Sequence, residues 1–277
     1  MQGGLESLVT PDAALVGAIL VAASAAFAPI TIVLVRRLYP WRQVVFARWG
    51  FSHVALVAVL FVGAQILGAS LLAPAGAGPL AGLALNALAF AFAGVFVCAL
   101  ARKRDPDGVR SLGFWRGRNL RAVGVGWVAY GLSWPGLMGL MFAWPWLVER
   151  YGGGFEPQQL ADLFRGFAGA ELAAAVALGT LVQPFLEELL FRGFLQPLLV
   201  QNFREIGGIA LTSALFAAMH GLDHFLPIFG LSMVLGAVML RTQRLSAAFA
   251  IHALHNASQI ALLLFLPFPA PAPGFVR

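Results

Sequence analysis

Residues Phe51–Leu72 read FSHVALVAVLFVGAQILGASLL, an apolar run without a single Asp, Glu, Lys or Arg. A transmembrane helix needs roughly 20 mostly apolar residues, because a helix rises about 1.5 Å per residue and the hydrocarbon core is about 30 Å thick. This run is therefore long enough to cross a bilayer. It predicts that lipid, rather than water, surrounds this part of the chain.

The whole chain shares this character. Of its 277 residues, 60% are hydrophobic and 11% are charged, whereas soluble proteins average about 45–50% apolar and about 25% charged residues. The net charge of +6 would suit nucleic acid, but the charges sit in short clusters between apolar runs, as in the cytoplasmic loops of membrane proteins. We expect an all-α, polytopic membrane protein with lipid as a partner and no nucleic acid.

The same length rule predicts about eight spans. They cover Ala13–Val35, Phe51–Leu72, Leu80–Ala101, Ala122–Val148, Ala168–Leu190, Ile206–His220, Phe225–Leu240 and Leu245–Phe268. The sixth and seventh are short, and the turn between them can lie within the membrane, so seven spans is the main alternative. The chain divides into an N-terminal part, residues 1–165 with helices one to four, and a C-terminal part, residues 166–277 with helices five to eight.

The basic residues give the orientation. If the spans alternate, fifteen of the eighteen basic residues fall on one side. They lie in Arg36–Arg48 and Arg102–Arg121, and at Arg192, Arg204, Arg241 and Arg244. Those on the other side are Arg150, Arg165 and Arg277. Because Lys and Arg accumulate in cytoplasmic loops, both termini are expected on the outer side.

Polar residues are concentrated in the C-terminal third of the chain. A charged residue inside a membrane costs roughly 2.5–3.5 kcal/mol on insertion scales, so it invites a functional hypothesis. The residues concerned are Glu187, Glu188, Arg192, His220, Asp223, His224, His252, His255 and Asn256. A single one is often a polar group hydrogen-bonded between helices, but this many on three segments indicate a functional site.

Helix geometry separates the two glutamates. Adjacent residues point about 100° apart, so Glu187 and Glu188 cannot share a face. Glu188 and Arg192 are four residues apart in the favourable order and are expected to form an ion pair. Glu187 then faces the bundle interior without a cation and can act as a general base toward water. Alternatively, Glu187 pairs with a histidine and both glutamates are structural.

His252 and Asn256 are also four residues apart and are expected to project together, whereas His255 can share their face or turn aside. An Asn amide N–H can donate to a developing oxyanion. A Glu, histidines and an Asn therefore hold the parts for activating water and stabilising a tetrahedral intermediate, and amide hydrolysis needs both. The chain has no H-E-x-x-H, which argues against a zincin-type protease.

Three motifs occur in order on successive apolar segments. EELLFR at Glu187–Arg192 matches E-E-x-x-x-R, FAAMH at Phe216–His220 matches F-x-x-x-H, and HALHN at His252–Asn256 matches H-x-x-x-N. Together they resemble the CAAX prenyl protease and bacteriocin-processing (CPBP, or Abi) family of intramembrane proteases. The resemblance covers about Glu171–Leu264, roughly the last third of the chain.

The resemblance implies a role for each motif residue. Glu187 would activate the water, with His220 sharing that proton or positioning the nucleophile. His252 and Asn256 would bind the oxyanion.

The remaining motif residues, Glu188 and Arg192, would by the same resemblance hold the first motif helix in place. The family is also described as metalloproteases, which would make Glu187, His220 and His252 ligands of a zinc ion. A glutamate-activated water without a metal is the alternative, and both stay open at this point.

The resemblance implies an intramembrane endopeptidase that hydrolyses a peptide bond in a hydrophobic or lipidated substrate, such as a prenylated CAAX protein. The alternative is a non-catalytic scaffold of the same fold, such as a bacteriocin-immunity or transporter-like protein that binds a peptide or ion. Short inter-span turns suit a compact multi-pass member of a bacterial inner membrane.

Glu187 and His252 must lie at the same depth in the membrane to form such a site. A straight fifth helix places Glu187 about 25 Å from its end at Arg204, whereas His252 lies only about 12 Å past Arg244. The groups can meet only if the fifth segment bends or surfaces early, and Gly193 is where a bend is expected, together with Pro197.

Overall fold

The computed structural model describes residues 11–40, 46–72, 78–114, 117–152 and 159–265, and every regular element in these ranges is a helix. The all-α fold class is therefore confirmed for the described residues. The N-terminal helices are α1 (Pro11–Leu38), α2 (Phe51–Leu72), α3 (Pro79–Arg104), η1 (Gly108–Leu112), α4 (Asn119–Gly152) and α5 (Gln159–Gly166).

The C-terminal part begins with a long helical segment, here called the rod, and ends with a helical pair. The rod contains α6 (Gly169–Ala177), η2 (Leu178–Val182), α7 (Gln183–Glu188), η3 (Leu189–Leu195) and α8 (Gln196–Ala218). The short η4 (Leu222–His224) then leads to α9 (Phe225–Thr242) and α10 (Leu245–Phe265). Both η2 and η3 are π-helical turns, a local widening that is frequent at functional sites.

Five helical segments of the described chain are long and apolar enough to cross a membrane. They are α2, α3, the rod Gly169–Ala218, the η4–α9 segment Leu222–Thr242, and α10. The rod contains both the fifth and the sixth predicted spans, while the first and fourth lie in α1 and α4. The count of about eight spans, the outward termini and the division after residue 165 stay predictions. Residues 266–268 of the last predicted span lie outside the described residues.

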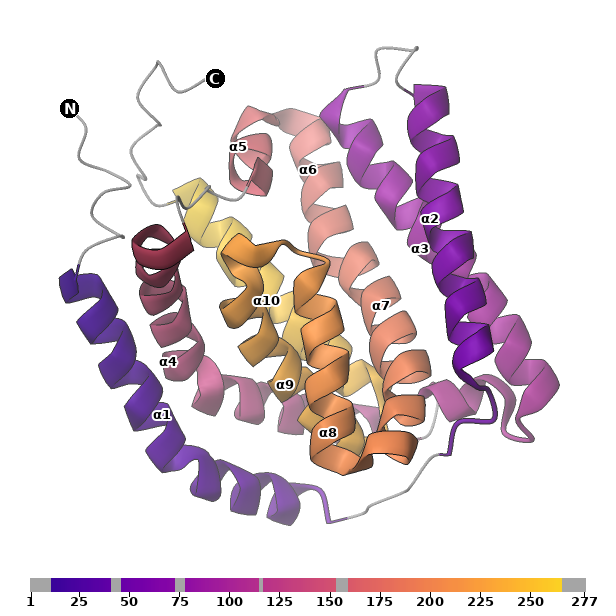
Figure 1. Cartoon of the computed structure of the whole chain (residues 1–277), viewed down its shortest axis with the longest axis horizontal. Helices are drawn as coiled ribbons and strands as arrows, with labels where there is room; N and C mark the ends of the chain where they lie inside the picture. Colours follow the sequence, from indigo (N-terminus) through magenta and orange to yellow (C-terminus); the bar gives the residue numbers. More distant parts are fainter. Residues whose placement is uncertain (1–10, 41–45, 73–77, 115–116, 153–158, 266–277) are drawn as a thin grey trace.

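The rod reverses direction within α8. Arg204 has a φ of 64° and a ψ of 174°, which are not helical, so residues 196–203 and 205–218 form two limbs (Figure 1). The limbs meet at Gly208, where an added Cβ would lie 2.4 Å from the Cα of Val200. This close approach requires a glycine and separates the fifth predicted span from the sixth.

The motif-bearing helices lie between the N-terminal helices. In Figure 1, α1 and α4 stand on one side of them and α2 and α3 on the other. One core cluster joins Val97 of α3 to Phe194 of η3, and another joins Tyr130 of α4 to Leu235 of α9 and Ile251 of α10. The N-terminal helices thus pack against the motif-bearing helices on both sides.

The outer face of α2 is apolar and exposed, as expected of a helix that faces lipid. Val59 is 68% exposed, Ile66 63% and Leu71 68%.

The estimate of the depth of His252 started from Arg244, but the start of α10 does not lie at the surface. Arg204 is exposed, but Arg244 is only 3% exposed. Its Nε donates to the carbonyl oxygen of Gly117 at 2.6 Å, and the amide of Leu245 donates to that of Gly113 at 3.1 Å. The segment between α3 and α4 therefore covers this turn, and α10 begins inside the protein. The rod has a π-helical turn at η3, which includes Gly193, but its non-helical residue is Arg204.

Candidate active site

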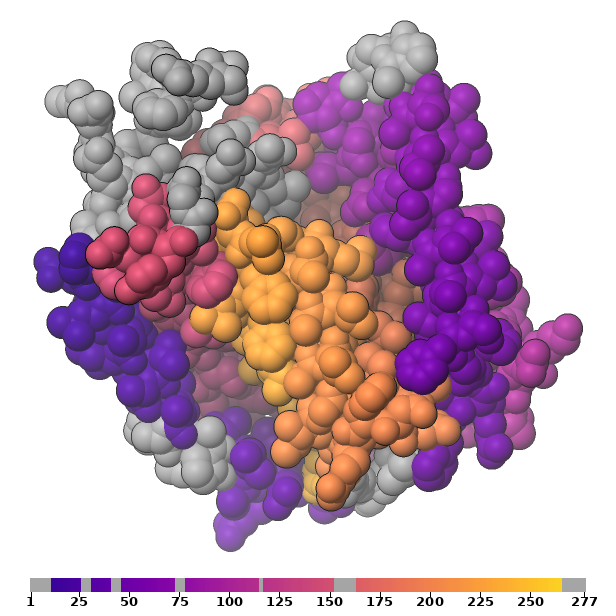
Figure 2. Space-filling view, in the orientation of Figure 1, coloured from indigo at the N-terminus to yellow at the C-terminus, as the bar shows by residue number. Residues whose placement is uncertain are grey.

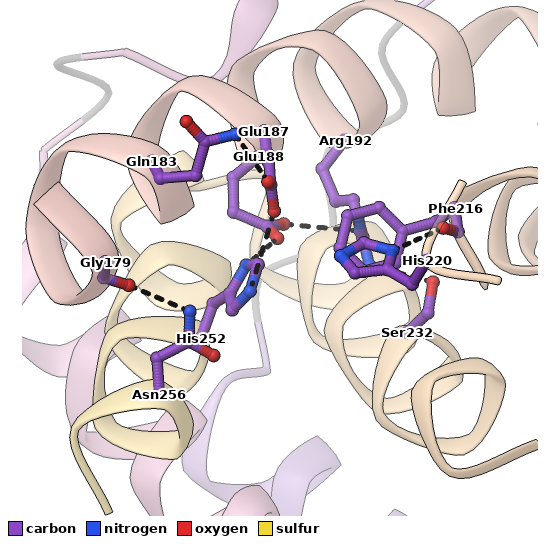
Figure 3. A network of polar contacts seen from close by, with 10 residues as sticks. All are labelled: Gly179, Gln183, Glu187, Glu188, Arg192, Phe216, His220, Ser232, His252 and Asn256. Atoms are coloured by element: carbon purple, nitrogen blue, oxygen red, sulfur yellow. Dashed lines mark hydrogen bonds and ion pairs between the residues drawn. The ribbon is translucent and has the colours of Figure 1, made fainter. Parts of the chain in front are cut away.

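Glu188 is the centre of a buried polar network (Figure 3). One carboxylate oxygen, Oε2, lies 3.2 Å from Nε of Arg192, one turn further along the rod. The other, Oε1, lies 2.8 Å from Nδ1 of His252 on α10. Both Glu188 and Arg192 have 0% relative exposure. The ion pair expected from the spacing is present, and His252 is an additional partner that the spacing did not predict.

Arg192 is also held from α9 and from the second limb of α8. Its Nη2 donates to Oγ of the buried Ser232 at 2.9 Å. The guanidinium carbon lies 4.6 Å from the ring centroid of Phe216, in cation–π geometry. The charge of Arg192 is thus balanced by Glu188 and its position is fixed by two further helices. This arrangement suits the supporting role expected for the pair.

Glu187 lies beside this network and is 7% exposed. Its Oε1 accepts a hydrogen bond of 2.7 Å from Nε2 of Gln183, one turn earlier. Its Oε2 lies 3.7 Å from Nε2 of His252, which is too long for a direct hydrogen bond. A water that contacts both atoms would lie beside the line that joins them. Glu187 therefore has a neutral amide on one side and an imidazole on the other.

His252 stands between the two carboxylates. Because a carboxylate only accepts hydrogen bonds, the 2.8 Å contact with Glu188 requires a hydrogen on Nδ1 of His252. That contact sets the orientation of the ring and turns Nε2 toward Glu187. The geometry couples Glu188, His252 and Glu187 in a row.

Asn256 lies one turn beyond His252 and contacts the rod. Its Nδ2 donates to the carbonyl oxygen of Gly179 at 2.9 Å, and Gly179 belongs to the π-helical turn η2. This hydrogen bond connects α10 to η2. Because the amide carries two N–H groups, one of them remains for another acceptor.

His220 lies after the end of α8 and is bonded within its own turn. Its Nδ1 lies 2.8 Å from the carbonyl oxygen of Phe216, and the two rings are 4.7 Å apart. The ring of Phe216 is also 5.8 Å from that of His252. Within the described residues, no hydrogen bond or ion pair joins His220 to Glu187. The role of His220 in proton transfer stays a prediction.

The extra histidine of the third motif points away from this network. Nδ1 of His255 lies 3.1 Å from the hydroxyl oxygen of Tyr130 on α4. Of the two positions left open by the sequence, His255 thus takes the one that turns aside.

The zinc set that the resemblance implies, Glu187, His220 and His252, stays a prediction. Among the described residues, no group of three His, Cys, Asp or Glu side chains could hold a metal ion. Nε2 of His252 lies 3.7 Å from Glu187, while its Nδ1 is bonded to Glu188. Nδ1 of His220 is bonded to the carbonyl oxygen of Phe216, so Nε2 is the ring nitrogen that each histidine could offer to a metal.

Two polar side chains of the site were not predicted. Gln183 precedes Glu187 by four residues, so the spacing rule that paired Glu188 with Arg192 could have identified it. Ser232 lies on a separate helix, α9, without a motif around it, and only the packing of that helix reveals its contact with Arg192.

Comparison with family models gives one match. Residues 169–258 match the type II CAAX prenyl endopeptidase Rce1-like family, and the matched range contains all three motifs from Glu187 to Asn256. Comparisons with curated proteins and with solved structures gave no match. The match supports the resemblance to the CPBP family of intramembrane proteases over residues 169–258.

Proposed function

We propose that this protein is an intramembrane endopeptidase in which Glu187 activates the attacking water. The observation that carries the proposal is the position of Glu187 within the Rce1-like segment. It is buried, it accepts a hydrogen bond from a neutral amide, and it faces His252 across 3.7 Å. A buried carboxylate that is not paired with an arginine, as Glu188 is, is suited to accept a proton.

The first step begins with a water that lies beside Oε2 of Glu187 and donates one hydrogen to it. Glu188 bonds Nδ1 of His252 and thereby turns Nε2 of the same ring toward this carboxylate oxygen. Glu187 takes the proton as the water oxygen forms a bond to the peptide carbonyl carbon, and the carbonyl oxygen becomes negatively charged.

The tetrahedral intermediate needs hydrogen-bond donors near its oxyanion. The second N–H of Asn256 and Nε2 of His252 lie on adjacent turns of α10 and can fill this role. Removing one donor of this kind typically lowers kcat about 10²–10³-fold. The intermediate then collapses with cleavage of the C–N bond, and the leaving nitrogen takes the proton from Glu187. The products are a new carboxylic acid, which keeps the second hydrogen of the water until it ionises, and a new amine, and Glu187 returns to its ionised form.

A membrane-associated peptide is the substrate class that suits this location. The helices around the site present apolar side chains outward, and the surface is hollowed between α8 and α2 (Figure 2). Helix α7, which carries Glu187, lies between these two helices in Figure 1. A hydrophobic or prenylated peptide of the CAAX type, which the family expectation favours, can approach from the lipid.

The test uses purified protein and a panel of prenylated and hydrophobic peptides. The wild type is expected to cleave at least one of them, and Glu187→Ala is expected to lose about 10²–10⁴-fold in kcat, the usual contribution of a general base. Glu188→Ala is compared in parallel, with the melting temperature of each variant in detergent. If wild type and Glu187→Ala bind alike and neither cleaves, the protein is a non-catalytic scaffold.

The same assay with a metal chelator added tests whether cleavage depends on a zinc ion held by Glu187, His220 and His252. Cleavage that persists in chelator, in a sample without stoichiometric metal, supports activation of the water by Glu187 alone. Cleavage that stops in chelator and returns with added zinc would assign the water to a metal.

A further inference from the structure

Gln183 makes a contact that no motif accounts for. It opens α7, directly after the π-helical turn η2, and its Nε2 donates to Oε1 of Glu187 at 2.7 Å. The orientation of its amide is determined by this contact, because a carboxylate accepts hydrogen bonds and an amide oxygen cannot donate one. The carbonyl oxygen Oε1 of Gln183 must therefore point away from Glu187.

That carbonyl oxygen is buried and has no donor within hydrogen-bond distance in the described part of the chain. A buried acceptor without a partner costs about 1–3 kcal/mol, and such groups in folded proteins are usually explained by a water or a ligand. The oxygen is attached to the same amide that bonds Glu187. A donor that reaches it is therefore placed directly beside the carboxylate.

The attacking water is not that donor. It is placed at Oε2 of Glu187, which faces His252, whereas Gln183 bonds the other carboxylate oxygen, Oε1. The residues just before Gln183 are open to the surroundings, since Leu181 is 55% and Val182 is 41% exposed. Gln183 follows them and is itself only partly buried.

We propose that Oε1 of Gln183 accepts a hydrogen bond from a backbone N–H of the peptide substrate, next to the bond that is cleaved. Gln183 then positions Glu187 with one end of its amide and the peptide with the other. A peptide N–H is the donor that every peptide substrate carries, whatever its side chains. This inference rests on the endopeptidase function proposed above.

The experiment is a double-mutant cycle in which one change is made at residue 183 of the enzyme and the other at one backbone N–H of the substrate. A peptide that the wild type cleaves is made as a series of esters, each replacing one backbone N–H beside the scissile amide by oxygen while leaving that amide intact. The kcat/KM of each ester is compared with that of the parent for wild type and Gln183→Met. Methionine has a similar length and no hydrogen-bonding amide.

Gln196→Met is the matched control. Gln196 is 2% exposed, donates to the carbonyl oxygen of Gly236 at 2.9 Å, and also has a buried Oε1 without a donor. In its case that oxygen is packed against Gly236, where an added Cβ would lie 2.9 Å from it. Gln196 lies in α8, beyond η3, so its replacement tests general loss of stability.

The wild type is expected to lose about tenfold in kcat/KM on one ester of the series, the usual scale of one hydrogen bond. Gln183→Met is expected to treat that ester and the parent alike, and Gln196→Met to keep the wild-type ratio. The same ester-to-parent ratio in all three proteins would overturn the role of Gln183 and leave the endopeptidase intact. A wild type that cleaves no peptide would overturn both.

Discussion

Arg192 and Glu188 are charged side chains with no exposure, and each is held by more than one partner. Removing one member of a buried ion pair leaves an uncompensated charge, whereas removing both often costs little. The pair therefore makes the stability of the rod sensitive to single substitutions.

Arg192→Met is expected to lower the free energy of unfolding by about 3–5 kcal/mol, because Glu188 then remains buried without its cation. The double variant Glu188→Gln with Arg192→Met should recover much of this loss, since a glutamine oxygen can still accept from His252. Thermal unfolding in detergent measures both. A double variant that is less stable than Arg192→Met would contradict the pairing.

Residue spacing predicted only part of the site. Positions four apart on a helix lie on one face, so the contact between Glu188 and Arg192 followed from the sequence. The same rule does not say which helices meet. The contacts of His252 with two carboxylates, and of Ser232 with Arg192, depend on how α9 and α10 pack against the rod.

At the scale of elements, the π-helical turn η2 and the helix α10 support each other. A hydrogen bond from the side-chain amide of Asn256 to the carbonyl oxygen of Gly179 joins them. It gives Asn256 a structural contact in addition to the oxyanion role proposed for its second N–H.

Asn256→Ala is expected to lower the free energy of unfolding by about 1 kcal/mol through the lost hydrogen bond and kcat by about 10²–10³-fold through the lost donor. Asn202→Ala is the control, because Asn202 makes a 2.8 Å bond to Leu198 within its own helix. Thermal unfolding and steady-state kinetics measure both effects. Equal behaviour of the two variants would argue against a special role for Asn256.

The reversal inside α8 gives a second prediction for an element. Gly208→Ala places a Cβ 2.4 Å from the Cα of Val200, so the two limbs must separate at a cost of about 1–3 kcal/mol. In Gly207→Ala the nearest contact is 3.4 Å, to Cβ of Phe203. Alanine there should be neutral or stabilising by up to about 1 kcal/mol.

Unfolding in detergent compares the two glycine variants. If Gly208→Ala is as stable as Gly207→Ala, the limbs are not packed as described.

Apolar runs predicted where helices occur but not how they connect. The predicted span Phe51–Leu72 is identical with α2, and the others correspond to helices with longer or shorter ends. Hydropathy could not predict the continuity of the rod from Gly169 to Arg204, its two π-helical turns, or the burial of Arg244. These depend on contacts between segments that are distant in the sequence.

At the scale of the whole molecule, the orientation rests on the distribution of basic residues. It is tested with a variant in which the only cysteine, Cys98, is replaced by serine. Single cysteines are then introduced by Lys103→Cys and Tyr151→Cys, both at exposed positions. An impermeant maleimide is expected to label position 151 in intact cells and position 103 only after permeabilisation. The reverse pattern would invert the orientation.

The central claim is that Glu187 removes a proton from the water whose oxygen attacks the peptide carbonyl carbon. Single-turnover cleavage in ¹⁸O-labelled water tests it most directly, with the enzyme in excess and the oxygen content of the first product measured by mass spectrometry. We predict one ¹⁸O atom in the new carboxylate from the first turnover, and no cleavage above background by Glu187→Gln. An unlabelled first product with ¹⁸O retained in the Glu187 carboxylate, or cleavage by Glu187→Gln at the wild-type rate, would contradict the account.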